Sequence, residues 1–458
     1  MSNPLRKLYR TAPKVLKKRI VSFSSCFPLE FIYGREYKRW NAWLKESDTW
    51  SEERIETFQI KKLKETFSMA YAETPYYHRL FDDCGFAPDE FRYLDQMKKI
   101  PFLTKQLIQD NIDRMVNSNL NKESILYYTT SGSTGIPMGM YKNNSDKVKE
   151  AAFVNYIWKE TGYRYDARIA VLRGAYYGDR GLCVKEGNRL LISTYDMTEE
   201  NLPTIYHSIV RFRPKFLHVY PSAVNILGEY MLKNRLEPIP SIQCIYTASE
   251  NLYSYQRETI EKAFRCKVFD FYGHTEHACM AKQVLEGYVT LWQYGFTELR
   301  YEEPVDPSEE SKINNMAEIV ATTYDNTAMP LIRYRTMDLV ANPENIGGRI
   351  SFKDIEGRKQ DFILTASGRK ISIAAINMHD EIFDHVQQFQ FYQDDMKKCV
   401  LRIVRRSEYG EDDEIKIRKK IGDKLGSDIY LELLYVNEIP RTKSGKYKFM
   451  DQRLPMQF

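Results

Sequence analysis

The stretch Tyr-Tyr-Thr-Thr-Ser-Gly-Ser-Thr-Gly-Ile-Pro-Met, residues 127–138, is the most informative part of the sequence. The apolar run Ile125–Tyr128 predicts a strand that leads into this turn of hydroxyl residues and glycines. Such a turn presents backbone N–H groups and hydroxyls to one point, and its glycines let a bulky anion approach the main chain. We therefore expect it to cradle the phosphates of a nucleotide. The cradle would consist of Thr130, Ser131, Gly132, Ser133, Thr134 and Gly135.

Two other glycine-loop chemistries fit this stretch poorly. No lysine follows Gly135, which disfavours the loop of P-loop nucleotidases. Only two residues separate the glycines, which disfavours the nucleophile elbow of hydrolases. A plain polar hairpin remains the alternative for this motif alone.

Outward from the loop, short apolar runs alternate with helical stretches. Residues 48–75 have the apolar spacing of a helix. Strands interleaved with helices predict an α/β fold in which helices cover the sheets. We expect a basic N-terminal segment over 1–47, a large αβ N-terminal domain over 48–358 and a small α+β C-terminal domain over 359–458. The predicted strands include Ile169–Arg173, Phe216–Tyr220, Ile242–Thr247, Lys267–Tyr272 and Ala317–Thr322.

Composition excludes several classes of protein. Of 458 residues, 43% are hydrophobic and 28% charged, which argues against disordered and fibrous chains. No apolar run approaches the roughly 18 residues that span a bilayer. The net charge of +5 is concentrated in residues 1–20, so the rest is nearly neutral and a broad nucleic-acid surface is disfavoured. The basic stretch is either an amphipathic helix on an anionic membrane or a solvated tail.

The cysteines and the N-terminus bear on the compartment. Seven scattered cysteines, an odd number without a C-x-x-C pair, indicate reduced thiols. The N-terminus lacks the apolar core and cleavage site of a secretory signal. We therefore expect a cytoplasmic protein, with contact at the inner membrane face as one reading of its basic stretch.

Four more motifs follow the glycine-rich loop. They are Tyr272-Gly-His-Thr-Glu276, Tyr334-Arg-Thr-Met-Asp338, Gly357-Arg358-Lys-Gln-Asp361 and Pro440-Arg-Thr-Lys-Ser-Gly-Lys446. With the loop they resemble, in order, the motifs of the adenylate-forming superfamily of acyl-CoA synthetases, peptide-synthetase adenylation domains and luciferases. Upstream, Thr74-Pro-Tyr-Tyr and Ile100-Pro-Phe-Leu-Thr-Lys resemble the phenylacetate–CoA ligase branch and its CapK-like relatives from surface-polysaccharide loci.

The resemblance implies an AMP-forming ligase with a mobile C-terminal domain. Such an enzyme uses ATP to convert a carboxylic acid to an acyl-adenylate and pyrophosphate, then passes the acyl group to CoA or to a sugar precursor of a surface polysaccharide. The resemblance places Lys446 at the attacking carboxylate and the α-phosphate, and Glu276 at Mg²⁺. Both roles suit the chemistry, because two anions must be brought together and Mg²⁺ takes few protein ligands. The alternatives are a solvated basic tail for Lys446 and a surface carboxylate for Glu276.

Further residues are expected around the nucleotide. By resemblance, Asp338 accepts from the ribose hydroxyls and Arg358 contacts the ribose–phosphate side. Tyr272 would stack on adenine, although an aromatic at a strand end also suits core packing, and a turn aspartate would explain Asp338. The remaining nucleotide-side positions are Ser249, Glu250, Gly273 and Thr275.

Some positions depart from the family pattern. Met138 stands where many relatives have lysine, Met337 replaces a glycine, and Gln360 replaces a charged hinge residue. These departures cast doubt on CoA as the acceptor more than on AMP transfer. His274, His277 and Cys279 suggest a zinc site, but no fourth ligand is evident, and we favour structural roles for them.

The acid itself is weakly specified by the sequence. Tyr176, Tyr177 and Tyr220 would give an aromatic, hydroxylated pocket for an aryl acid or a small hydroxylated acid, and core packing explains them equally well. A rival from another class is a non-catalytic nucleotide-binding or scaffold protein of a capsular polysaccharide assembly complex. The presence of Glu276, Asp338 and Lys446 argues against that rival.

Overall fold

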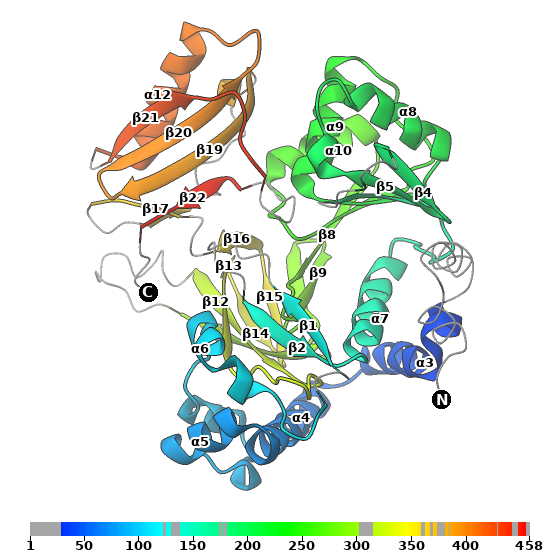
Figure 1. The fold of residues 1–458 in the computed structure, drawn as a ribbon, viewed down its shortest axis with the longest axis vertical. Helices are drawn as coiled ribbons and strands as arrows, with labels where there is room; N and C mark the ends of the chain where they lie inside the picture. The colour runs from blue at the N-terminus through cyan, green and yellow to red at the C-terminus, as the bar shows by residue number, and fades with distance from the viewer. Residues whose placement is uncertain are drawn as a thin grey trace.

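The computed structural model describes most of the chain, and its elements form a large body with a smaller C-terminal unit beside it (Figure 1). The described residues are 29–121, 125–129, 138–173, 177, 181–301, 315–358, 362–366, 370–372, 381–383, 385–427, 429–441 and 448–454. Within these ranges, every helix is too short or too polar to cross a lipid bilayer.

A ten-stranded sheet runs through the large body in the order β14-β15-β10-β9-β8-β7-β6-β3-β5-β4. Strands β5, β3, β6, β7 and β8 are parallel, whereas the flanking pairs are antiparallel. The bounds are β3 Ile169–Arg173, β4 Cys183–Glu186, β5 Arg189–Ser193, β6 Phe216–Val219, β7 Cys244–Thr247, β8 Lys267–Gly273, β9 Met280–Val284, β10 Gly287–Thr290, β14 Glu344–Ile346 and β15 Arg349–Phe352.

Helices cover both faces of the parallel strands. Helices α8 (Leu202–Phe212), α9 (Pro221–Lys233) and α10 (Ser254–Phe264) share one apolar core with alternate strand residues such as Leu217. Helix α7 (Asp146–Lys159) covers the other face, where Trp158 lies in a second core with Phe216. Because successive strand residues point to opposite faces, both sides of this part of the sheet are apolar and buried.

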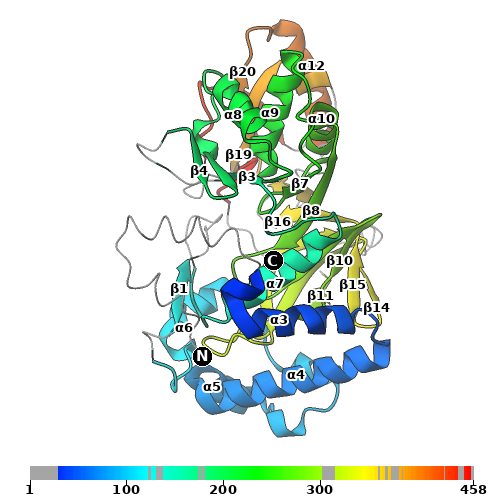
Figure 2. The same cartoon turned by 90° about the vertical axis from the view of Figure 1, so that its right-hand side faces the viewer.

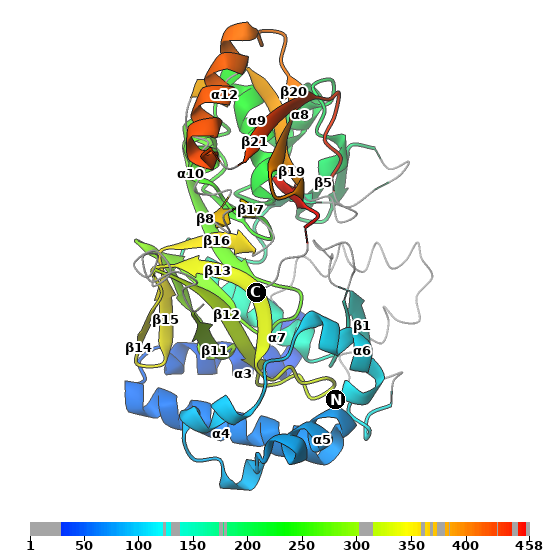
Figure 3. The same cartoon turned by 90° about the vertical axis from the view of Figure 1, so that its left-hand side faces the viewer.

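A second, antiparallel sheet adjoins a helical layer (Figure 3). Its order is β11-β12-β13-β16, and its strands are β11 Gly295–Arg300, β12 Met316–Thr323, β13 Tyr334–Ala341 and β16 Asp354–Arg358. The layer consists of α4 (Glu52–Glu73), α5 (Pro75–Cys84) and α6 (Lys105–Met115). Buried aromatic residues join layer and sheet, and Tyr77 Oη donates to the carbonyl of Pro330 at 2.9 Å.

Helix α3 (Leu29–Ser47) lies beside α7 in the large body (Figure 2). Tyr37 packs in one core with Val148 and Ala152 of α7, and Leu44 packs in the core that holds Trp158. The apolar residues of 29–47 therefore share their core with the body, although the sequence placed this range in a separate basic segment. The basic residues 1–20 lie outside the described ranges.

The C-terminal unit has its own apolar core. Helix α12 (Glu411–Leu425) packs on a sheet with the order β21-β20-β19-β22. The strands are β19 Val386–Asp395, β20 Lys398–Arg405, β21 Tyr430–Tyr435 and β22 Met450–Gln452, and a separate pair consists of β17 Phe362–Leu364 and β18 Lys370–Ser372. The α/β fold class predicted from the sequence is confirmed.

The C-terminal unit contacts the body at α9 and α10 (Figure 1). Arg406 pairs with Glu229 on α9, with 2.5 Å between Nη2 and Oε2. The ring of Phe449 meets Tyr253 at a centroid distance of 4.9 Å. Arg441 Nη1 donates to Ser222 Oγ at 3.2 Å. The described contacts between the two units thus combine an ion pair, a hydrogen bond and an aromatic contact.

Candidate active site

The turn after β8 carries the central carboxylate of the site. Glu276 is 5% exposed, and its Oε1 accepts a 2.7 Å hydrogen bond from Tyr334 Oη. His274 Nδ1 lies 3.3 Å from Oε2 without hydrogen-bonding geometry. Burial tends to raise the pKa of Glu276, but His274, Lys105 and Tyr334 together hold that pKa far below its usual range. The carboxylate is therefore ionised at neutral pH.

Tyr272 and Asp338 meet between β8 and β13. Tyr272 Oη donates to Asp338 Oδ2 at 2.6 Å, and the Asp338 backbone N–H donates to Thr336 Oγ1 at 3.1 Å. Tyr272 is only 7% exposed and packs in an apolar core. The phenol thus fixes the orientation of the Asp338 carboxylate. Adenine stacking by Tyr272 stays a prediction.

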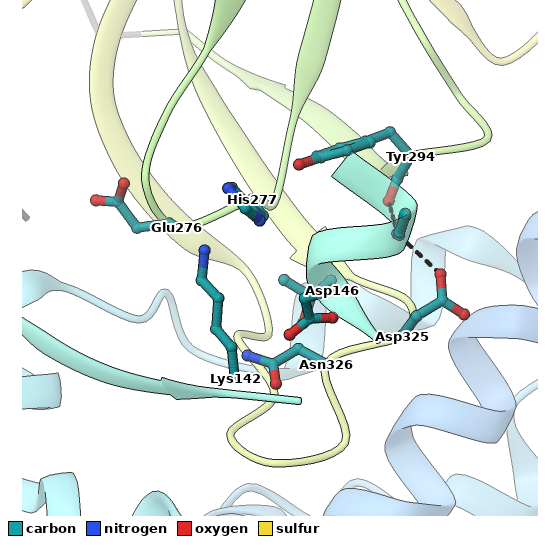
Figure 4. A pocket seen from close by; sticks show the side chains of 9 residues that line it. Lys142, Asp146, Glu276, His277, Tyr294, Asp325 and Asn326 are labelled. Atoms are coloured by element: carbon teal, nitrogen blue, oxygen red, sulfur yellow. Dashed lines mark hydrogen bonds and ion pairs between the residues drawn. The ribbon is translucent and has the colours of Figure 1, made fainter. Parts of the chain in front are cut away.

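A lysine that the motifs do not include supports the Glu276 turn. Lys142 ends β2 (Gly139–Lys142) and is 1% exposed. Its Nζ donates to the carbonyl of Thr275, next to Glu276, and faces that turn (Figure 4). Burial lowers the pKa of Lys142 to about 8, although Glu150, Asp146 and Glu276 oppose this shift.

The space behind the turn is small and is lined mostly by polar and charged side chains (Figure 4). Its lining residues are Lys142, Asp146, Lys149, Glu276, His277, Tyr294, Thr323, Asp325 and Asn326. Lys149 Nζ lies 2.8 Å from Asp325 Oδ2 and donates to the carbonyl of Tyr294 at 2.7 Å. Burial raises the pKa of Asp146 to about 6. These charged contacts tie α7 to the loops on either side of it and make the support of the turn rigid.

Comparisons with known proteins give one family match and several relatives. Residues 363–452 match the family described as the CapK C-terminal domain. Protein CapK of Staphylococcus aureus is 24% identical over 97% of this chain and 98% of its own length. Phenylacetate-coenzyme A ligase of Escherichia coli strain K12 is 27% identical over 76% of this chain and 80% of its own length.

These relatives agree with the resemblance of the sequence motifs to the adenylate-forming superfamily.

The chain is similar to CapK and to the phenylacetate–CoA ligases, the branch that its upstream motifs resemble. A solved structure of 2-hydroxyisobutyryl-CoA ligase, in complex with an acyl-AMP, shares the fold with a TM-score of 0.66. It is 18% identical to this chain, and the match covers 87% of this chain and 89% of that structure.

The structure brings several expected residues of this family together. Asp338 and Arg358 are register partners on β13 and β16, so the positions expected at the ribose lie side by side. Ser249 follows β7 with a positive φ of 73°, and Glu250 Oε2 accepts from the backbone N–H of Ser222 at 3.0 Å. Gly273 ends β8 before the Glu276 turn. Glu250 therefore fixes the start of α9 through this hydrogen bond. Its place near the purine of the nucleotide stays a prediction.

Other predictions fall outside the described residues. The phosphate cradle, Thr130, Ser131, Gly132, Ser133, Thr134 and Gly135, is among them, as are Tyr176 and Lys446. The flanking strands β1 (Leu126–Thr129) and β2 are described, and Thr129 pairs with Gly139. The glycine-rich sequence thus connects two strands, β1 and β2, that pair with each other in antiparallel fashion.

The departures from the family pattern have structural counterparts. Met138 is 0% exposed and packs with the aromatic core under α4. The buried cation after the loop is instead Lys142, four positions later. Sequence reasoning missed it because lysine on a strand normally faces solvent, and the only signal was its place after an apolar run.

The suggested zinc residues make separate contacts. His274 lies by Glu276, His277 Nε2 lies 3.8 Å from Glu150 Oε2, and Cys279 Sγ accepts from Thr297 Oγ1 at 3.4 Å. Burial lowers the pKa of His277 to about 4. Within the described ranges, no group of three or more such side chains is arranged to hold a metal ion.

Proposed function

We propose that the protein activates a carboxylic acid with ATP, giving an acyl-adenylate and pyrophosphate, and then transfers the acyl group to an acceptor. Its relatives named phenylacetate-coenzyme A ligase support an AMP-forming ligase. The observation that supports the proposal best is the Glu276 turn. The carboxylate of this turn is buried, ionised and hydrogen-bonded to Tyr334 Oη, and Lys142 Nζ donates to the carbonyl of the preceding residue, Thr275.

The donor set at Glu276 fits Mg²⁺. A single ionised carboxylate with retained water is a common way for proteins to hold this ion, and the low pKa of Glu276 keeps it in the form that binds metal. When bound, Mg²⁺ would neutralise triphosphate charge as it moves to pyrophosphate. Tyr334 and the Lys142-anchored backbone hold Glu276 in place.

The nucleotide would lie between the two sheets. Asp338, oriented by Tyr272, would accept from the ribose hydroxyls, and Arg358 would contact the ribose–phosphate side. Ser249 and Glu250 would lie near the purine. The glycine-rich loop would donate to the phosphates, and Lys446 would contact the attacking carboxylate and the α-phosphate.

The acceptor is CoA or a sugar precursor of a surface polysaccharide. Relatives named phenylacetate-coenzyme A ligase favour CoA, whereas the match to CapK over nearly the whole chain favours the second acceptor. If the basic residues 1–20 rest on an anionic membrane, transfer would take place at the inner membrane face of the cytoplasm.

Lys446→Ala tests the proposal directly. We would measure ATP-dependent pyrophosphate release over aryl, acyl, hydroxy and amino acids with hydroxylamine as a trap, with and without CoA. For the acid that supports release, we expect the variant to lose at least about 100-fold in rate, because it loses charge stabilisation in the transition state.

Lys443→Ala, in the same basic loop, is the matched control and should retain activity. Further stimulation by CoA would identify the acceptor. Equal release by wild type and Lys446→Ala would contradict the proposed role of Lys446. No release with any acid, despite ATP binding, would favour the scaffold reading.

A further inference from the structure

At the end of β3, the guanidinium of Arg173 has no anionic partner among the described residues. The side chain of Arg173 is partly buried, and its Nη2 donates to Nε2 of His218. Its Nε–H is shielded from solvent and has no acceptor among the described residues. Within the described ranges, no carboxylate lies within ion-pair distance of Arg173.

The groups around Arg173 do not neutralise it. Burial and the charge of Arg173 lower the pKa of His218 well below its usual value, so this imidazole is neutral. Arg189 adds positive charge, whereas Tyr177 and Tyr220 are phenols, and the Tyr220 ring centre lies 5.9 Å from the guanidinium carbon. A buried cation without a counter-charge is costly unless a ligand supplies one.

Glu150, the carboxylate that acts electrostatically on Arg173, is engaged elsewhere. Glu150 on α7 contributes to the electrostatic environment of Arg173, but its Oε2 accepts from Tyr294 Oη at 2.5 Å. His277 Nε2 lies 3.8 Å from the same oxygen. Glu150 thus has Tyr294 and His277 as its close neighbours and forms no ion pair with Arg173 among the described residues.

Arg173 also lies where ligands bind in this kind of sheet. Strands β3, β6 and β7 end together, because Leu172 pairs with Val219 and Val219 pairs with Thr247. Ligands of open α/β sheets bind outside the C-terminal ends of the parallel strands. The Glu276 turn follows β8 at this same edge.

We propose that Arg173 binds a second anionic group of the substrate, so that the acid carries a carboxylate or phosphate at the end remote from its reacting carboxylate. The proposal rests on the proposed function and names its substrate class. A guanidinium binds such groups through two parallel hydrogen bonds. Tyr177 and Tyr220 would then flank a short chain between the two acidic ends, in place of the aryl or hydroxy acid suggested by tyrosines alone.

Acid pairs of equal length test this proposal. We would measure hydroxylamine-trapped pyrophosphate release with malonate against propionate, succinate against butyrate and glutarate against pentanoate. Succinamate would replace the second charge by an amide, and 3-phosphonopropionate would distinguish phosphate from carboxylate. We expect at least one doubly anionic acid to exceed its neutral-tailed partner by roughly 100-fold in kcat/KM, because breaking a buried charge pair has an effect of this size.

Arg173→Gln separates recognition from structure. It should lower kcat/KM for the doubly anionic acid by roughly 100-fold and leave the monocarboxylate unchanged, whereas Arg173→Lys should retain part of the preference. Arg168→Gln is the control, since Arg168 lies at the other end of β3, where Nη1 donates to the carbonyl of Phe212 at 3.1 Å. It should change neither value.

Three results would overturn the proposal. A preference of the wild type for monocarboxylates would do so while leaving the proposed function intact. An equal loss for both acids in Arg173→Gln would show that Arg173 has only a structural role. No release with any acid would overturn the proposed function, and this inference with it.

Discussion

At the scale of single residues, Lys142 shows how burial turns a common side chain into a pH-sensitive one. Its pKa in the folded protein is about 8, below the 10.5 of the unfolded chain. Between these values the unfolded chain binds more protons, so the free energy of unfolding rises with pH. Relative to Lys142→Met, the wild type should gain up to ~3 kcal/mol from pH 7 to pH 10.5, measured by urea unfolding.

Lys147→Met is the control for this measurement, because Lys147 is exposed on the same segment. Its stability difference from wild type should stay nearly constant over this range. A constant difference for Lys142→Met as well would show that Lys142 is not desolvated. The variant also removes the donor to the Thr275 carbonyl, so we expect the KM for Mg²⁺-ATP to rise.

At the scale of secondary-structure elements, β13 contains a residue in a conformation that favours glycine. Met337 has a φ of 66°, and its N–H lies 3.3 Å from Glu318 Oε1. A left-handed conformation costs a non-glycine residue roughly 1–2 kcal/mol. Met337→Gly should therefore raise the free energy of unfolding by about 0.5–1 kcal/mol, after the greater freedom of unfolded glycine is subtracted.

Thermal or urea unfolding of Met337→Gly and Met396→Gly checks this prediction. Met396 joins β19 and β20 without a positive φ, so its replacement should destabilise the protein. If Met337→Gly destabilises to the same degree, the left-handed strain at Met337 does not exist.

Elements were easier to predict than contacts. The run Phe216–Tyr220 predicted β6 because a continuous apolar run is typical of a strand that is buried on both faces of a sheet. The observed strand ends at Val219, one residue before the end of the predicted one. The motifs identified Glu276 and Asp338 as residue types, but not their partners. Tyr334 and Tyr272 come from other strands, and a single sequence does not show which strands become neighbours. Lys142 and Arg173 stayed hidden because both depart from the rule that basic side chains face solvent.

At the scale of the whole molecule, one ion pair joins the two units across their described interface. The Glu229–Arg406 pair is partly exposed, so it contributes at most about 1 kcal/mol. Glu229→Gln should therefore shift the balance between domain arrangements by no more than about 5-fold, away from this one. Energy transfer between fluorescent labels on the two units would give the distribution of distances between them. Small-angle scattering of the unlabelled protein would check the shift independently.

Glu237→Gln, on the exposed connection after α9, is the matched control and should leave the distribution unchanged. High salt should act in the same direction as Glu229→Gln, because it screens the ion pair. A distribution that responds to neither would show that the Glu229–Arg406 pair does not set the arrangement of the two units, which would then depend on the contacts of Tyr253 with Phe449 and of Arg441 with Ser222.

Ser222 joins two parts of the molecule that have been described separately. Its amide donates to Glu250 on the side expected for the nucleotide, and its hydroxyl accepts from Arg441 of the C-terminal unit. Thermodynamic reciprocity applies to such a shared residue: if nucleotide binding strengthens the contact with Arg441, then the domain arrangement that makes this contact must strengthen nucleotide binding by the same free energy. One serine at the start of α9 would thus let nucleotide occupancy and domain position report on each other.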